Sequence, residues 1–392
     1  MKRILPIIVI AQFFCTSVWF AGNAFMGDIA EQLHFDPAYL TRLSSAVQFG
    51  FIAGTLIFAI LSIADRFSPV KVFFSCAIIS ALINLGASIN DITLGDLMLF
   101  RFGTGFFLAG IYPVGMKIAS DHYRQGLGKS LGFLVGALVL GTAFPNLLIS
   151  IAIPLPYKLV IYITSLLSAL GGVAMLLLVP DGPGRKQGQK LSFSGFLGGF
   201  NDPQFKAAAF GYFGHMWELY AFWVFVPVIL KFYKEHNSAA DYNVPLLSFL
   251  IIASGSISCV VSGFISQKIG ATKTATNALL ISCICCLVSP LFFFSNTTEA
   301  FIAFMFVWSM AVIADSPLFS TLVAQNAPVT SKGSALTIVN SIGFAITIIS
   351  IQLISSLRTS TNAWYIYTLL AIGPIFGLVA LSGNNKEADP IN

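Results

Sequence analysis

The stretch IYPVGMKIASDHYRQGLGKS, residues 111–130, decides the fold because a later stretch of the chain repeats its pattern. The later stretch is DSPLFSTLVAQNAPVTSKGS, residues 315–334, and it aligns Pro113 with Pro317 at an offset of 204 residues. Both stretches begin inside an apolar run and end in a polar loop. A parallel repeat of about half the chain length predicts two halves of similar structure.

Composition places both halves in a membrane. Of the 392 residues, 56% are hydrophobic and 9% are charged, and the mean hydropathy is +0.85. Soluble domains carry about 25% charged residues, so a soluble protein is excluded. The net charge of +5 comes from scattered basic residues that form no patch or stripe, which argues against nucleic acid as a partner.

Runs of about 20 apolar residues predict an all-α polytopic membrane protein, since barrel strands are shorter and alternate in polarity. The N-terminal sequence, Lys2-Arg3 followed by an apolar run, resembles a signal peptide. The run is longer than the apolar core of a signal peptide, so we expect this segment to be kept as the first membrane span. Twelve spans are predicted, at 4–26, 39–63, 71–90, 94–118, 129–151, 158–179, 206–231, 245–266, 274–294, 300–324, 334–357 and 364–382.

The distribution of basic residues predicts orientation and domains. With both termini on one side, that side receives 15 of the 21 Lys and Arg residues, so the termini are expected to be cytoplasmic. The longest polar stretch follows the sixth span. We therefore predict an N-terminal six-helix bundle (1–180), a cytoplasmic linker (181–205) and a C-terminal six-helix bundle (206–392).

Two short motifs resemble those of a known family. Asp65-Arg66 follows the second span, a degenerate echo around Gln267-Lys268 follows the eighth, and Arg101-x-x-x-Gly105 lies in the fourth. These residues resemble the loop and fourth-helix motifs of the major facilitator superfamily, and the chain is similar to its bacterial porters, loosely those grouped with nitrate and cyanate transporters. The resemblance implies two pseudo-symmetric six-helix bundles, with helices one, four, seven and ten lining a central cavity.

Four ionisable residues lie at membrane depth, where such groups are usually functional. They are Arg101 in span four, His215 and Glu218 in span seven, and Asp315 in span ten. We predict that Glu218 carries a proton with His215 as its relay partner, because the two share a helix face; the alternative is a static pair of Glu218 with His215 or Arg101. Asp315 is a third proton-coupling candidate, or else it caps the helix after Pro317.

Arg101 suits an anionic solute, because its guanidinium is always charged and binds carboxylates in a forked geometry. The alternative is a structural pair with Glu218 or Asp315. Polar and aromatic residues on the cavity-lining stripes extend the predicted substrate site, although aromatic residues in membrane helices more often serve packing. The predicted substrate-binding set is Arg101, Trp19, Asn23, Gln48, Tyr112, Trp217, Trp308 and Asn340.

The same resemblance implies a different role for Asp65 and Arg66. It implies a conformational latch at the cytoplasmic helix ends that stabilises the outward-facing state. The alternative is ordinary anchoring by positive charge on the cytoplasmic side. All six cysteines fall in apolar runs, which indicates helix packing rather than disulfides or a metal site, and no cofactor is expected.

The sequence thus predicts a secondary active transporter that moves a small, anionic solute by alternating access with proton coupling. An uncoupled uniporter or a solute and drug exporter is the main alternative, and a membrane-embedded enzyme or a receptor is a further one. No Walker-type phosphate loop is present, so the driving force would be an ion or solute gradient. Protons, a small solute and the lipid bilayer are the expected partners of a monomer in a bacterial inner membrane.

Overall fold

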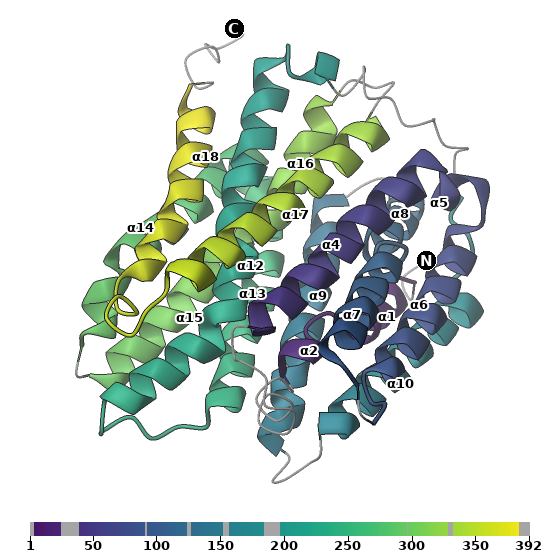
Figure 1. Cartoon of the computed structure of the whole chain (residues 1–392). Coiled ribbons are helices and arrows are strands. Elements are labelled where there is room, and N and C mark those ends of the chain that lie inside the picture. Colours follow the sequence, from purple (N-terminus) through teal and green to yellow (C-terminus); the bar gives the residue numbers. More distant parts are fainter. Residues whose placement is uncertain are drawn as a thin grey trace, which may run out of the picture. The chain divides into compact units, whose positions relative to one another are not determined.

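A computed structural model of the chain describes residues 4–24, 39–90, 92–123, 127–151, 157–183, 197–295, 297–327 and 332–383. Within these ranges every regular element is helical, which confirms the predicted all-α class. The helices up to the predicted linker are α1 (Ile4–Thr16), α2 (Ala21–Ala24), α4 (Tyr39–Ile60), α5 (Ile63–Arg66), α6 (Pro69–Gly86), α7 (Leu94–Leu108), α8 (Tyr112–His122), α9 (Leu127–Ile151) and α10 (Tyr157–Leu178) (Figure 1). Those that follow it are α12 (Pro203–His236), α13 (Val244–Ile269), α14 (Ala271–Phe293), α15 (Thr298–Ala314), α16 (Ser316–Asn326), α17 (Lys332–Leu357), the 3-10 helix η1 (Ile366–Ala371) and α18 (Ile372–Ser382).

The membrane segments agree with the predicted count of twelve. Ten helical segments of the described chain are long and apolar enough to cross a membrane. Two of the ten join consecutive helices, α7 with α8 and α15 with α16. Two shorter apolar helices, Ile4–Thr16 and Ile366–Ser382, complete the twelve.

The fourth and tenth segments both break at the prolines that the sequence repeat aligned. Pro113 lies in the first turn of α8 and Pro317 in the first turn of α16. A proline is tolerated there because the first turn of a helix needs no N–H donor from it. Pro145 and Pro227, by contrast, lie inside α9 and α12, which run on through them. A proline inside a membrane segment therefore does not by itself end a helix.

Two compact units divide the chain. One consists of Met1–Gly188 and Tyr242–Ser256, and the other of Gln189–Asp241 and Ile257–Asn392. The division at 188 falls inside the predicted linker, but the first part of α13 groups with the first unit, whereas the sequence assigned the whole eighth span to the second half. A close approach accounts for this grouping, because a Cβ on Gly136 of α9 would lie 3.1 Å from the carbonyl oxygen of Ser256.

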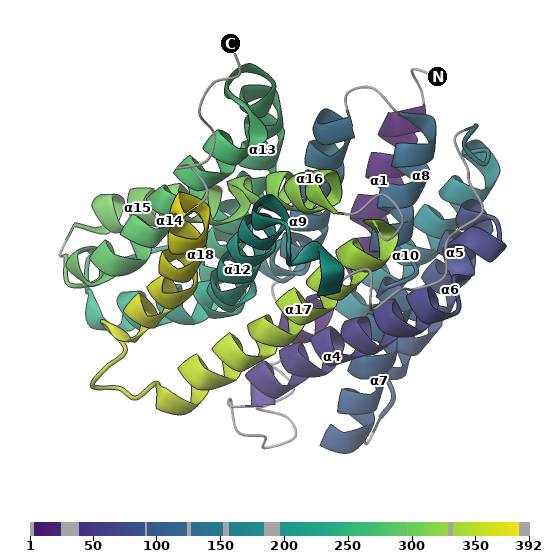
Figure 2. The ribbon, with the colours of Figure 1, turned by 90° about the horizontal axis from the view of Figure 1, so that it is seen from above.

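In the first unit, α4 runs side by side with α7 (Figure 1, Figure 2). Glycines bring the two backbones together. A Cβ on Gly105 would overlap the backbone carbonyl of Val47, and a Cβ on Gly50 would overlap that of Phe102. Close backbone approach through small residues is how membrane helices gain packing energy when lipid supplies no hydrophobic drive.

Gly105→Ala is therefore expected to destabilise the protein by about 1–3 kcal/mol, the usual cost of forcing extra volume into a packed helix contact. The measurement is the midpoint of thermal unfolding in detergent. Gly95→Ala is the matched control on the same helix, because its added Cβ would meet only Thr93 Oγ1 at 3.7 Å. Equal midpoints for the two variants would contradict this account of the α4–α7 contact.

In the second unit, α12 is the central helix and packs against α16, α17 and α18. The crossing with α18 is again made by glycines. A Cβ on Gly214 would overlap the carbonyl of Gly373, and a Cβ on Gly373 would overlap that of Gly214. On another side, α14 packs against α15 and η1. These contacts fix the faces of α12 that carry His215 and Glu218.

Candidate functional site

A break in the first membrane segment leaves two backbone carbonyl groups inside the first unit. α1 ends at Thr16 and α2 begins at Ala21, although the sequence predicted an uninterrupted span. Arg101 on α7 fills the break, where its Nη2 donates to the carbonyl of Val18 at 2.9 Å and to that of Trp19. Carbonyls beyond a helix end have no partner within the helix, so the guanidinium satisfies groups that would otherwise be left unpaired.

Arg101 also joins a polar network between helices. Its side chain is 1% exposed, and its Nη1 donates to Oδ1 of Asn84 on α6 at 3.0 Å. The amide of Asn84 in turn donates to the hydroxyls of Thr164, at 3.2 Å, and Ser165, at 2.9 Å, on α10. Every one of these partners is neutral. The network therefore gives both terminal nitrogens of Arg101 acceptors without neutralising its charge, while Nε has no hydrogen-bond partner among the described residues.

The second unit buries a carboxyl group. Glu218 on α12 is 1% exposed. The hydroxyl of Ser282 lies 2.6 and 2.5 Å from its two oxygens, and Oε1 also accepts from Nε1 of Trp308 at 2.6 Å and from Sγ of Cys286 at 3.2 Å. Ser282 and Cys286 are one turn apart on α14, and Trp308 belongs to α15. Donors from two neighbouring helices thus hold this carboxyl group in place.

One turn earlier on α12, His215 faces a different acid. Its Nδ1 lies 2.8 Å from Oδ1 of Asp315, the residue that separates α15 from α16. Both side chains are buried. Nε2 of His215 and Oδ2 of Asp315 have no hydrogen-bond partner among the described residues. The pair therefore retains a buried ring nitrogen and a buried carboxyl oxygen that make no hydrogen bond within the described residues.

These pairings differ from the sequence-based expectation for His215 and Glu218. The two are three residues apart and therefore about 60° apart around the helix axis, which is enough to reach different neighbours. The side chain of Glu218 reaches donors on α14 and α15, whereas that of His215 reaches Asp315 at the break between α15 and α16. Asp315 likewise differs from the capping alternative, because its side chain makes no capping hydrogen bond to α16.

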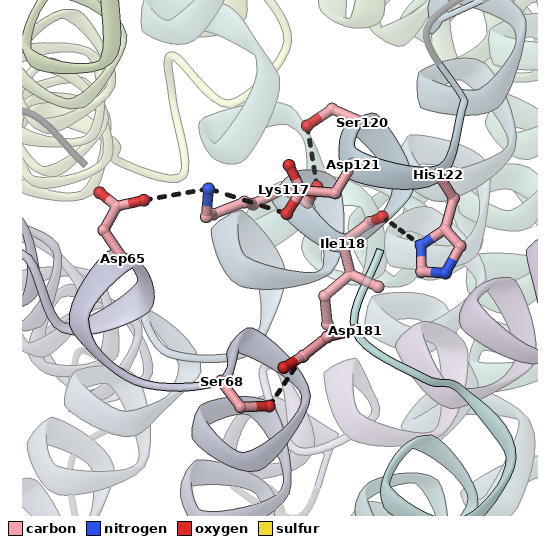
Figure 3. Close-up of polar contacts among 8 residues, drawn as sticks. All are labelled: Asp65, Ser68, Lys117, Ile118, Ser120, Asp121, His122 and Asp181. Atoms are coloured by element: carbon pink, nitrogen blue, oxygen red, sulfur yellow. Dashed lines mark hydrogen bonds and ion pairs between the residues drawn. The ribbon is translucent and has the colours of Figure 1, made fainter. Parts of the chain in front are cut away.

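A second cluster lies where α5, α6, α8 and the end of α10 meet in the first unit (Figure 3). Lys117 on α8 bridges two acids, with its Nζ 3.0 Å from Asp65 Oδ1 and 3.8 Å from Asp121 Oδ2. Asp65 belongs to α5, so the bridge fastens the loop after the second segment to the end of the fourth. Arg66, the other predicted latch residue, is exposed and forms no ion pair with the described residues.

The chain leaving the sixth segment joins this cluster. Ser68, the N-cap of α6, donates to Asp181 at 2.7 Å and accepts from the backbone N–H of Lys71. Gly182 lies against α8, where a Cβ would come within 2.6 Å of the Asp121 Cβ. The predicted latch residue Asp65 is thus one part of a network that also holds the start of the predicted linker.

A family model described as "Major Facilitator Superfamily" matches residues 8–351 of the chain. The chain belongs to the major facilitator superfamily. Members of this superfamily move solutes across membranes, so the chain is a multi-pass membrane transporter rather than an enzyme. A search of curated proteins found no significant match.

The fold is also similar to that of solved structures. One of them is the crystal structure of the human organic anion transporter MFSD10 (TETRAN), which matches with a TM-score of 0.69 and 13% sequence identity. The match covers 97% of this chain and 99% of the other. At this identity the likeness establishes the superfamily fold alone.

Within the superfamily fold, the other residues predicted to contact solute occupy several environments. Trp308 donates its indole N–H to Glu218, and Trp217 donates its own to the carbonyl of Leu369 at 3.1 Å. The ring of Trp19 packs on Phe51 at 4.9 Å between centroids. Gln48 and Tyr112 are buried and Asn340 is half-buried; the side chain of Asn23 lies outside the described residues. Of the predicted set, Arg101 and Trp19 meet in the first unit, where Nη2 of Arg101 donates to the Trp19 carbonyl.

Sequence reasoning missed several residues that complete these sites. Asn84 is a single amide in an apolar span, and Ser282 and Cys286 are small residues that normally indicate helix packing. Lys117 and Asp121 have the i,i+4 spacing of a helical ion pair, so this pair could have been predicted from the sequence. The donors on α14 had no comparable signal, because a hydroxyl or thiol in a membrane helix usually bonds to its own backbone.

Proposed function

We propose that the chain is a secondary active transporter that moves a small anionic solute by alternating access and couples this movement to protons. The observation that carries the proposal is the buried pair of His215 and Asp315 at the break of the tenth segment. Ionisable groups at membrane depth are costly and mark ion and solute pathways. The proposed setting is a bacterial inner membrane, with a monomer whose termini both face the cytoplasm.

Asp315 is the better proton carrier of the two buried acids. One of its oxygens faces His215, and the other has no partner among the described residues. A proton can therefore be added or removed without breaking a set of hydrogen bonds. His215 at 2.8 Å stabilises the ionised carboxyl group through its ring nitrogen. The carrier role that the sequence favoured for Glu218 thus passes to Asp315.

Glu218 is proposed to hold α12 against α14 and α15. Its two oxygens are occupied by a hydroxyl, a thiol and an indole N–H, and this arrangement suits one fixed geometry. Buried polar networks with every member satisfied rigidify and specify packing. A carboxyl group in such a network resists exchange, because each protonation step rearranges several bonds.

The charge of Arg101 is the reason for proposing an anionic solute. Its guanidinium is buried with neutral partners only, so the positive charge of the first unit has no internal compensation at this point. An anion that approaches the network gains an electrostatic attraction that a cation would not have. In this proposal Arg101 attracts the solute through its charge while its hydrogen bonds remain with the protein.

The experiment is transport in proteoliposomes under an imposed pH gradient. A panel of anionic and cationic metabolites is first tested for thermal stabilisation of the purified protein, and the best stabiliser is then used as the labelled solute. Proton coupling predicts accumulation above equilibrium that disappears when an ionophore collapses the gradient. A uniporter would reach equilibrium only, and uptake driven by solute exchange without a pH effect would indicate the exporter alternative.

Asp65→Asn is expected to slow transport roughly two- to fivefold, because a partly exposed ion pair contributes about 0.2–1 kcal/mol to the state that contains it. The reason is that Lys117 loses its nearer carboxylate, at 3.0 Å. Turnover is measured in proteoliposomes and solute binding by thermal shift, and only turnover should change. Glu235→Gln, which removes the exposed partner of Lys231, is the control. Loss of solute binding in Asp65→Asn would contradict the latch role.

A further inference from the structure

Phe319 lies one turn after Asp315, at the start of α16. Residues four apart share a face of a helix, so the two side chains point to the same neighbour. The backbone N–H of Phe319 donates to the carbonyl of Asp315 at 2.9 Å, which joins the two residues within one turn of regular backbone. Phe319 is 0% exposed. A movement of α16 would therefore carry the acid and the ring together.

The ring of Phe319 packs against a glycine of α12. A Cβ on Gly211 would lie 2.4 Å from Cε1 of Phe319, which is closer than any side chain tolerates. Gly211 lies one turn before His215 and shares its face of α12. The Phe319 ring also borders the imidazole of His215, with the two centroids 6.1 Å apart. The absence of a side chain at Gly211 thus makes room for the ring beside the histidine.

Two contacts one turn apart therefore join α12 to α16. Gly211 receives the ring of Phe319, and Nδ1 of His215 lies 2.8 Å from Oδ1 of Asp315. The spacing of four residues is the same on both helices and the order is reversed, as antiparallel helices require. The first contact depends on shape and the second on the protonation of an acid. Each contact holds the helices in the position that the other needs.

The two halves of the tenth segment have different attachments. In the last turn of α15, the carbonyl of Ile313 accepts from Sγ of Cys259 on α13 at 3.6 Å. By contrast, α16 packs most extensively on α12, with further contacts to α14 and α17. The break at Asp315 separates these two sets of neighbours. The position of α16 on α12 is therefore set by its own contacts and not by α15.

Three titratable side chains lie within electrostatic reach of Asp315. They are His215 and Glu218 on α12 and Cys259 on α13. No lysine or arginine in the described ranges forms an ion pair with this acid. Glu218 is held by its own donors, and Cys259 donates to a backbone carbonyl. Protonation of Asp315 thus acts on the α12–α16 contact through His215.

We propose that Phe319 is a positioning residue for the proton pair: packed against Gly211, it docks α16 on α12 and thereby holds Asp315 beside His215. This inference rests on the proposed proton coupling. A proton shifts a conformational equilibrium only through a contact that differs between the two states. The contact between His215 and Asp315 exists only while α16 lies on α12, so proton uptake changes how firmly α16 is docked. Without the ring the two groups separate, and proton uptake loses this effect.

Phe319→Leu tests the proposal, because it keeps an apolar side chain and removes the part of the ring nearest Gly211. Hydrogen–deuterium exchange of the purified full chain should show the amides of α16 exchanging roughly tenfold faster, since a buried contact of this helix is lost. In proteoliposomes with an imposed pH gradient, the accumulation ratio should fall toward one while counterflow continues. The labelled solute is the anion selected in the stabilisation panel. A purely structural defect would lower both activities in proportion to the folded protein.

Phe301→Leu is the matched control on the other half of the segment. Phe301 is also 0% exposed and stacks on Tyr233 with 3.8 Å between centroids. The same substitution there should speed exchange in α15. It should leave both the exchange of α16 and the ratio of accumulation to counterflow unchanged.

Gly211→Ala approaches the same contact from α12. Its Cβ displaces the ring, so this variant should resemble Phe319→Leu. Combining the two substitutions should restore part of the accumulation, because the shorter side chain leaves room for the added methyl group and effects of contacting residues are not additive. If Gly211→Ala folds poorly, Phe319→Leu and Phe319→Met carry the test.

The outcomes distinguish this inference from the proposed function. Equal accumulation by wild type and Phe319→Leu would overturn the role of Phe319 and leave proton coupling intact. Unchanged exchange of the α16 amides in Phe319→Leu would overturn it as well. A wild-type protein that shows no accumulation driven by a pH gradient would overturn both the inference and the function on which it rests.

Discussion

Asp315→Asn is expected to abolish proton-driven accumulation while leaving solute exchange intact. The amide keeps the size of the carboxyl group at the break between α15 and α16, but it cannot take up or release a proton. A gradient of one pH unit supports about tenfold accumulation per coupled proton, which corresponds to about 1.4 kcal/mol. In the variant the accumulation ratio should fall to about one at every imposed gradient.

Counterflow separates loss of coupling from loss of folding. In that assay labelled solute exchanges with unlabelled solute and no net proton movement is required, so Asp315→Asn should remain active. Glu299→Gln removes an exposed acid from the first turn of α15 and serves as the control. Accumulation that persists in Asp315→Asn would eliminate this residue as the proton carrier.

Glu218→Gln is the comparison that assigns the two buried acids. Because Glu218 accepts from Ser282, Cys286 and Trp308, an amide at this position brings its own N–H groups against several donors. Unpaired buried donors cost about 1–3 kcal/mol each, so thermal stability should fall while pH-driven accumulation persists in the folded fraction. The reverse result, normal stability and lost accumulation, would return the carrier role to Glu218.

Most of the fold was predictable because it depends on composition and periodicity. Apolar runs gave the membrane segments. The breaks of the fourth and tenth segments at Pro113 and Pro317 were not predicted, because Pro145 and Pro227 lie in similar apolar runs and do not end their helices. The break in the first segment was not predictable. No proline or glycine stands between Thr16 and Ala21, and the donor that stabilises the open carbonyls, Arg101, is more than 80 residues away in sequence.

The candidate site was predictable in residue type but not in pairing. Helical spacing gives the angle between His215 and Glu218, but it does not say which neighbour supplies the better partner. Glu218 turns to small side chains on α14 that look like packing residues, and His215 turns to an acid 100 residues later. Pairing depends on rotamers and helix contacts, and a single sequence contains neither.

Substitution of Arg101 is expected to have the largest effect on stability. Arg101→Met would leave the carbonyls of Val18 and Trp19 and the amide oxygen of Asn84 without their donor. Each buried acceptor left unsatisfied costs about 1–3 kcal/mol, so a total on the order of 5 kcal/mol is expected. Arg101→Lys should recover only part of this loss, since a single ammonium cannot span three separated acceptors.

Thermal unfolding in detergent measures this effect, and Arg42→Gln, an exposed arginine on α4, is the control. If Arg101 served only to bind solute, Arg101→Met would unfold at the temperature of the wild type and would fail only in solute binding. A large fall in the unfolding temperature in the absence of solute would instead assign Arg101 to the helix break.

Asn84→Asp separates the hydrogen bonds of Arg101 from its charge. The carboxylate has the shape of the amide and accepts the same bond from Nη1, at 3.0 Å in the wild type, but it neutralises the guanidinium. The variant loses the donor that the Asn84 amide gives to Thr164 and Ser165, so its unfolding temperature should fall somewhat but stay well above that of Arg101→Met. Binding of an anionic solute should weaken roughly tenfold, because a removed attraction of about 1.4 kcal/mol corresponds to that factor. Unchanged anion affinity in a stable Asn84→Asp variant would show that the buried charge of Arg101 has no part in attracting the solute.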